Sequence, residues 1–203
     1  MRTEEPRAIH LADYQAPDFR IETVHLDFAL DPESTRVAAK LAITRQRAGA
    51  PLVLHGEELK LISVTLDGKA LIEGEYRLDA KSLTIVSVPD RFVLETVCEI
   101  APAANTALEG LYQSAGIFCT QCEPEGFRRI TWFLDRPDNL SVFTVRMQAD
   151  REQYPVLLSN GNRLEAGPLG GGRHFALWHD PFPKPSYLFA LVAGDLGSIH
   201  DSF

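Results

Sequence analysis

Apolar and polar residues alternate with a period of two through most of this chain, and this pattern constrains the fold more than any other feature. Within residues 21–30, Val24, Leu26, Phe28 and Leu30 would share one face of an extended chain, and polar residues occupy the other. Such a segment predicts a β-strand with one buried and one solvated face. The Asp-Pro-Glu-Ser sequence at 31–34 is a turn signal, and the alternation resumes over 37–43, which predicts an antiparallel hairpin.

The same pattern recurs at short intervals along the chain. It predicts further strands over residues 52–54, 62–66, 76–78, 83–86, 94–100, 142–147, 156–159 and 175–178, and, from a weaker β composition, 187–194. Asp67-Gly68 follows one of these strands and is a strong hairpin signal. Helical periodicity is scarce, and one short helix is predicted near residues 127–134, ahead of Pro137. Many short strands at this spacing predict an all-β fold, a β sandwich or a pair of curved sheets.

Composition narrows the possible partners and compartment. Asp and Glu total 28 against 20 Lys and Arg, a net charge of −8, which argues against a nucleic-acid surface because phosphate binding needs clustered positive charge. No stretch approaches the ~18 apolar residues of a membrane helix, and the first residues lack the apolar core of a signal peptide. The three cysteines are too few for a disulfide scaffold. We therefore expect a cytoplasmic protein without a membrane partner.

Motifs that carry chemistry are missing. Cys119 and Cys122 form a C-x-x-C, but a structural zinc site needs four ligands and the redox motif needs a βαβ unit, so both are expected as free thiols, buried or half-buried. Neither H-E-x-x-H nor G-x-S-x-G occurs. We expect no catalytic residue and no metal ligand in this chain. Taken alone, the residues indicate a binding or accessory domain.

Several longer motifs occur in a fixed order. They are N-T-A-L-E-G-L-Y at 105–112, Q-C-E-P-E-G-F-R at 121–128, I-T-W-F-L-D-R-P-D at 130–138, L-S-N-G-N at 158–162 and H-D-P-F-P-K-P-S-Y-L-F at 179–189. On these motifs the sequence resembles the aminopeptidase N family of zinc metallopeptidases, and especially its bacterial branch. The resemblance covers most of the chain, from about residue 14 to residue 203. Matching several motifs in order is far more specific than any single short pattern.

The resemblance implies both an architecture and an activity. It implies a saddle-shaped N-terminal β domain over residues 1–195, with 196–203 beginning the linker into a zinc catalytic domain that this chain lacks. In the full-length enzyme, a zinc-bound water and a general-base Glu of that catalytic domain would remove N-terminal amino acids from peptides. The partners implied are peptides with a free N-terminus and the catalytic domain of the same polypeptide. The chain alone is expected to be inactive and to bind no stoichiometric zinc.

Two residues gain a role from the resemblance, Glu123 and Gln121. Glu123 matches the acidic residue that helps to bind the α-amino group of the substrate, and Gln121 matches a neighbour that lines the same pocket. A carboxylate binds an ammonium through a charge-assisted hydrogen bond, and the contact would fix which peptide bond meets the metal. Residues two apart in a strand face the same side, and Pro124 would stiffen the loop behind Glu123. Without the resemblance, Glu123 would be expected as a solvated surface charge, which remains the expectation for Glu125.

Two alternatives remain open at this stage. The chain could be a stand-alone β-sandwich module that binds a peptide or another protein. A domain that awaits a partner domain should instead expose an apolar patch of more than a few hundred Å² beside Glu123. A leukotriene hydrolase-like relative would share the domain but not the complete sequence motif at residues 121–128.

Overall fold

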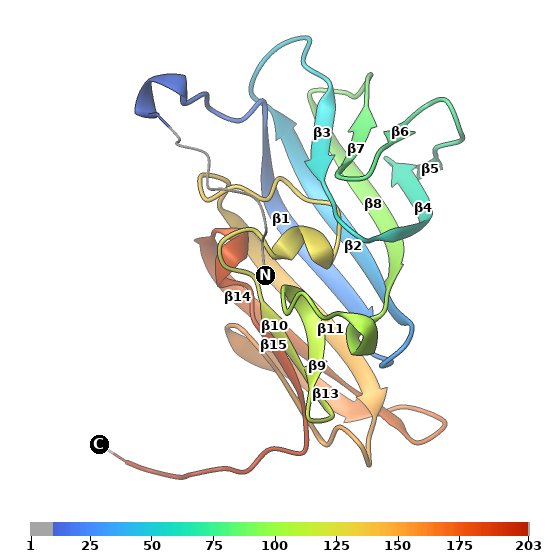
Figure 1. The fold of residues 1–203 in the computed structure, drawn as a ribbon, viewed down its shortest axis with the longest axis vertical. Helices are drawn as coiled ribbons and strands as arrows, with labels where there is room; N and C mark the ends of the chain where they lie inside the picture. Colours follow the sequence, from blue (N-terminus) through green and yellow to red (C-terminus); the bar gives the residue numbers. More distant parts are fainter. Residues whose placement is uncertain (1–9, 203) are drawn as a thin grey trace.

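The computed structural model describes residues 10–202 and shows a chain built from strands and short turns (Figure 1). Four 3-10 helices interrupt the strands: η1 (Leu11–Asp13), η2 (Pro102–Ala104), η3 (Phe127–Arg129) and η4 (Ser186–Leu188). The strands are β1 (Phe19–Ala29), β2 (Thr35–Arg45), β3 (Leu52–His55), β4 (Lys60–Leu66), β5 (Lys69–Ala70), β6 (Arg77–Leu78), β7 (Ser82–Ile85), β8 (Arg91–Ile100), β9 (Gly110–Ser114), β10 (Ile117–Gln121), β11 (Ser141–Asp150), β12 (Val156–Ser159), β13 (Asn162–Pro168), β14 (Arg173–Lys184) and β15 (Leu191–Gly194). In residues 10–202 no helix has the length and apolar character needed to cross a membrane.

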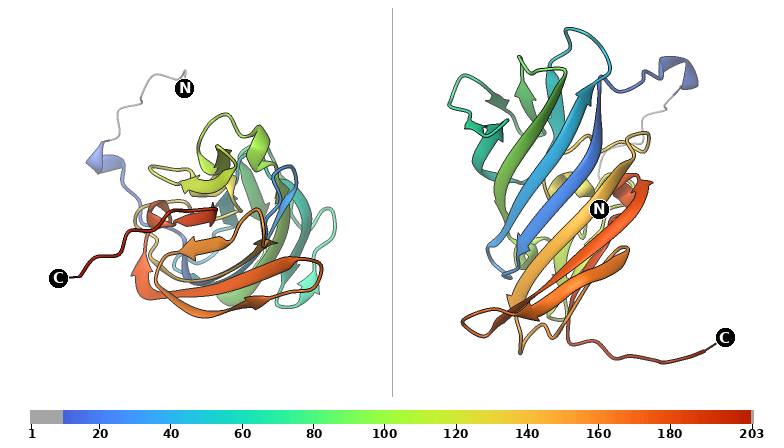
Figure 2. Two further views of the ribbon diagram at one scale, coloured as in Figure 1. Left: turned by 90° about the horizontal axis from the view of Figure 1, so that it is seen from below. Right: turned by 180° about the vertical axis from the view of Figure 1, so that it is seen from behind.

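One large sheet forms the frame of the molecule. Its eight strands run in the order β13-β14-β11-β1-β2-β8-β4-β5, and all neighbours are antiparallel except β1 and β11. Long strands twist with a fixed hand, and the sheet is visibly twisted and curved when it is seen from behind and from below (Figure 2).

Two smaller sheets cover one face of the large sheet. One has the order β12-β15-β10-β9 and the other β3-β7-β6, and both lie in front of the large sheet in Figure 1. The large sheet and the two small sheets enclose a common core. The predicted all-β fold of curved, packed sheets is confirmed.

The core follows from the alternation in the sequence. Phe28 of β1 and Phe143 of β11 are buried on the inner face of the large sheet. They meet Phe127, Phe133 and Phe189, which come from the segments in front of the sheet, with ring centroids 4.8–6.3 Å apart. Burying aromatic rings in edge-to-face contact stabilises the packing of the layers. Phe127 therefore fixes the segment that precedes it to the centre of the core.

The short helix predicted near residues 127–134 is present only as the three residues of η3. Beyond it, Phe133 exchanges two backbone hydrogen bonds with His55 at the end of β3, with N···O distances of 2.8 and 3.0 Å. Residues 130–135 are all buried. A surface helix would leave one face in solvent, whereas this segment is buried on all sides. Its backbone groups at Phe133 are satisfied by hydrogen bonds to β3 instead of by a helix.

The other predicted elements hold with a few differences. The Asp67-Gly68 hairpin is confirmed, with φ angles of 48° and 79°, as the turn between β4 and β5. The predicted strand over 187–194 begins only at Leu191, because η4 occupies 186–188. Strands β9, β10 and β13 were not predicted. The last strand ends at Gly194, and the proposed boundary after residue 195 stays a prediction.

Candidate functional site

Gln121 and Glu123 lie at the exposed end of the four-stranded sheet. Gln121 is the last residue of β10, and the chain turns over residues 123–126. Glu123 is thus outside the strand, and the expectation that the two residues share a strand face does not apply. They are coupled differently, since the side-chain amide Nε2 of Gln121 donates to the backbone oxygen of Glu123 at 3.0 Å.

The two acidic side chains of this turn differ in whether a cation lies beside them. Glu125 lies 3.5 Å from the guanidinium of Arg128. The carboxylate of Glu123 is exposed, and in residues 10–202 it has no hydrogen-bond or ion-pair partner. An unpaired carboxylate can accept hydrogen bonds from a cation that arrives from outside. Of the two, Glu123 is therefore the available anion.

The turn itself is tightly closed. The amide of Gly126 donates to the carbonyl of Cys122 at 2.8 Å, and a Cβ on Gly126 would stand 2.3 Å from the carbonyl oxygen of Gln121. Cys122 is 3% exposed, and burial raises the pKa of its thiol well above the usual range. The residue beside Glu123 thus serves as an apolar anchor, and its thiol is not poised as a nucleophile.

A buried ion pair fixes the downstream end of the turn. The backbone amide and Nε of Arg128 donate to Oδ2 of Asp135 at 3.1 and 3.0 Å, and Nη2 of Arg128 donates to the Asp135 carbonyl at 3.1 Å. Ser186 donates to Oδ1 of Asp135 at 2.6 Å. No role was predicted for these residues from the sequence, although all three lie inside the motifs that carried the resemblance. Their position within these ordered motifs was the only signal that the sequence offered.

An apolar row crosses the outer face of the four-stranded sheet beside Gln121. Tyr112, Cys119, Val192 and Leu158 are paired across β9, β10, β15 and β12, and they are half-buried or, for Leu158, 40% exposed. Their neighbours on the other face, such as Phe118 and Ala193, are fully buried. Cys119 and Gln121 are two residues apart in β10, so Gln121 stands at the end of this row. We call these four residues the apolar row.

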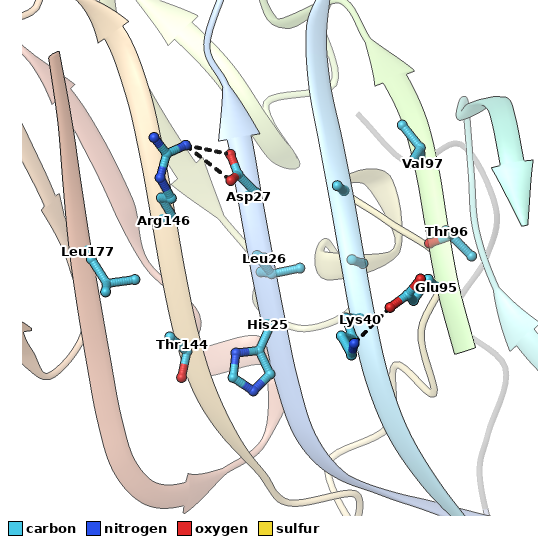
Figure 3. A pocket seen from close by; sticks show the side chains of 12 residues that line it. His25, Leu26, Asp27, Lys40, Glu95, Thr96, Val97, Thr144, Arg146 and Leu177 are labelled. Carbon is cyan, nitrogen blue, oxygen red and sulfur yellow. Dashed lines mark hydrogen bonds and ion pairs between the residues drawn. The ribbon is translucent and has the colours of Figure 1, made fainter. Parts of the chain in front are cut away.

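A separate hollow lies on the face of the large sheet that carries His25 (Figure 3). Its volume is about 320 Å³, and it contains no residue of the 121–128 segment. Its charges are paired within the sheet, Lys40 with Glu95 at 2.8 Å and Arg146 with Asp27 at 3.1 Å. Groups already neutralised by a neighbour offer little to a charged ligand, so the hollow does not belong to the candidate site.

The three cysteines differ in how far they are buried. Cys119 is half-buried and Cys122 is buried, and both are free thiols, as predicted; Cys98 is also a buried free thiol. Burial raises the pKa of Cys98 to about 12. Within residues 10–202, no group of three or more His, Cys, Asp or Glu side chains could hold a metal ion.

The layered β fold ends its four-stranded sheet in a turn whose Glu123 carboxylate is exposed and, in residues 10–202, unpaired. The family model of the peptidase M1 N-terminal domain matches residues 14–188. The chain belongs to this family, and the resemblance seen in the sequence is confirmed. Aminopeptidase N of Caulobacter vibrioides is 58% identical over 100% of this chain, which covers 24% of that protein. Aminopeptidase N of Escherichia coli is 51% identical over 99% of the chain and 23% of its own length. The chain spans about a quarter of the length of these relatives.

Solved structures agree with this assignment. Aminopeptidase A of Legionella pneumophila, in complex with aspartic acid, superposes with a TM-score of 0.87 at 38% identity and covers 92% of this chain and 22% of its own. An M1 zinc metallopeptidase of Deinococcus radiodurans has a TM-score of 0.76 at 16% identity, over 87% of this chain and 42% of its own. At that identity the second likeness shows the fold alone.

Proposed function

We propose that this chain is the N-terminal domain of a zinc aminopeptidase and that Glu123, with Gln121 beside it, binds the α-amino group of the substrate. The family membership and the aminopeptidase N relatives support the class of enzyme. The substrates are peptides with a free N-terminus. The zinc ligands and the general base would belong to a catalytic domain of the same polypeptide, where the metal would supply an activated water for hydrolysis of the first peptide bond.

One observation carries the role of Glu123: it is an unpaired carboxylate on a braced turn. The neighbouring acid Glu125 lies beside Arg128, whereas Glu123 faces outward without a partner in residues 10–202. An exopeptidase must recognise an ammonium group, and a fixed carboxylate does this through a charge-assisted hydrogen bond. A rigid contact at the N-terminus also sets the register, so that only the first peptide bond reaches the metal.

The apolar row supports a partner domain on the same side of the molecule. Half-exposed apolar side chains that run across four strands are typical of a surface covered by another protein unit. Gln121 ends this row, so a domain docked on it would bring its own residues close to Glu123. We further propose a cytoplasmic location, which the low, odd cysteine count and the three free thiols support. Cell fractionation would test it.

The experiment is a pair of substitutions in the full-length enzyme that contains this domain. Glu123→Ala is expected to lower kcat/KM for aminoacyl substrates. The loss should correspond to roughly 2–5 kcal/mol of transition-state stabilisation, the scale for truncating one partner of a desolvated charge pair. Glu125→Ala is the matched control, since it removes a carboxylate from the same turn, and its kcat/KM is expected to stay near wild type. Unchanged kcat/KM in the Glu123 variant would remove this residue from the site. The isolated chain, assayed beside its parent, is expected to be inactive.

A further inference from the structure

We propose that Asp135 is a positioning residue: by joining Arg128 to Ser186 it holds the turn that carries Glu123 in a fixed place. This inference rests on the proposed function, because it concerns how the amine-binding carboxylate is held. The supporting observation is a set of hydrogen bonds that holds the turn at both of its ends. We call this set the ring; it joins Thr120 to Leu191, and Arg128 through Asp135 to Ser186.

The upstream end is held by Thr120, one residue before Gln121. Its hydroxyl accepts from the amide of Leu191 at 2.9 Å and donates to the carbonyl of the same residue at 3.3 Å. Leu191 is the first residue of β15, which pairs with β10 through Cys119 and Val192. A side chain that bonds both backbone groups of one residue fixes the two strands in register at this point.

The downstream end is held by Asp135. Its side chain is 1% exposed, and both carboxylate oxygens are used, one by Arg128 and the other by Ser186. A buried carboxylate is costly unless it is paired and hydrogen-bonded, so this set of contacts is strongly coupled. Loss of the Ser186 contact would leave Oδ1 without a donor in the interior.

The two anchors converge on one short segment of the chain. Ser186 opens η4, and Leu191 follows five residues later at the start of β15. Thr120 and Asp135 therefore tie both ends of the 121–128 turn to residues 186–191. A turn held at both ends to the same unit cannot shift without breaking buried hydrogen bonds. Glu123 has few contacts of its own, so its position depends on this ring.

A general loss of stability must be separated from a loss of positioning, and Ser141 offers a matched control. Ser141 is 0% exposed and donates to the carbonyl of Ile21 at 2.6 Å, and Ser186 is 1% exposed and donates to Asp135 at the same distance. It lies on β11, outside the ring. Ser186→Ala and Ser141→Ala each remove one buried hydroxyl, but only the first opens the ring.

The first measurement uses the 203-residue chain itself. Hydrogen exchange of the Gly126 amide reports the closure of the turn, because this amide donates to the carbonyl of Cys122. We expect its exchange to be about tenfold faster in Ser186→Ala than in the wild type, the effect of losing one buried hydrogen bond, and unchanged in Ser141→Ala. Equal exchange rates in the two variants would overturn the proposal.

The second measurement uses the full-length enzyme and two inhibitors, leucine hydroxamate and its analogue without the amino group. Their affinity ratio isolates recognition of the amine. We expect this ratio to fall about tenfold in Ser186→Ala and to stay constant in Ser141→Ala. If Glu123→Ala lowers the ratio and Ser186→Ala does not, the positioning role is wrong and the amine site stands. If Glu123→Ala leaves the ratio unchanged, the proposed function itself fails.

Discussion

The charges around the turn leave one carboxylate for a ligand. Arg128 points inward to Asp135, and the next residue, Arg129, lies among three carboxylates: Glu58 at 2.7 Å, and Glu57 and Glu109 at 3.5 Å. Both arginines nearest in sequence to Glu123 are therefore occupied by other acids. An opposite charge held at 3 to 4 Å removes most of the attraction that an arginine could exert on a third group. The negative charge of Glu123 stays free to meet an external cation.

His55 gives a prediction at the same scale, because its backbone supports the segment behind the turn. Burial, followed by the nearby charge of Arg128, lowers the pKa of His55 below 6.5, and its Nδ1 is buried without a partner in the described residues. The folded chain therefore binds fewer protons than the unfolded chain below pH 6.5, so stability is lost as the pH falls through this range.

The measurement for His55 is urea unfolding at about pH 7.5 and about pH 5.5. The loss of unfolding free energy between the two conditions should be smaller in His55→Gln, which carries no titratable group, than in the wild type. Identical losses in the two proteins would show that His55 does not contribute to the acid sensitivity.

Two glycines in connections between strands have the same left-handed backbone conformation but different surroundings. Gly68, in the β4–β5 turn, has a φ of +79° and nothing within 4 Å of the point where a Cβ would stand. Gly161 lies where the chain passes from β12 in one sheet to β13 in another; it has a φ of +82°, and a Cβ there would stand 2.2 Å from the carbonyl oxygen of His179. Gly68→Ala should cost about 1–2 kcal/mol, the strain of a left-handed residue. Gly161→Ala should cost about 1–3 kcal/mol more, because the overlap adds to the same strain. Chemical denaturation of both variants checks the difference, and equal costs would contradict it.

The elements that could be predicted from the sequence are those with a strong local pattern. The alternation within β1 and β2 and the Asp67-Gly68 turn are determined by residues that are close together in the sequence, so they can be recognised without knowledge of the fold. Strands β9 and β10 have no clear alternation. They exist because β9 pairs with β10, and β10 pairs with β15, more than 70 residues away. The helical pattern near 127–134 was overridden by the bridge between Phe133 and His55.

The candidate site shows the same division between local and distant information. Gln121 and Glu123 came from a motif, and the motif could not show that β10 ends between them. The contact of Asp135 with Ser186 joins residues 51 positions apart. No local sequence pattern predicts this contact, because it depends on how the sheets bring the buried segment 130–135 next to η4.

For the whole molecule, the two faces of the layered fold differ in what they offer. The outer face of the large sheet carries charges that are paired within the sheet around the hollow of Figure 3. The four-stranded sheet on the other side carries the apolar row, next to the turn with Glu123. Exposed apolar area is removed from water at a gain of about 25 cal/mol per Å², so the second face is the one expected to dock a further domain.

Cys119 makes this docking measurable, because it lies within the apolar row. In the isolated chain we expect Cys119 to react with a maleimide, while Cys98 and Cys122 stay protected by burial, which also raises the pKa of both thiols. In the full-length polypeptide, a domain docked on the row should slow the reaction of Cys119 by at least about tenfold. Mass mapping of the labelled peptides identifies each thiol, and His25→Cys, on the exposed face of the large sheet, provides a position that should react equally in both proteins. Equal labelling of Cys119 in the two proteins would show that the apolar row is not the docking face, and the catalytic domain would then have to approach Glu123 from another side.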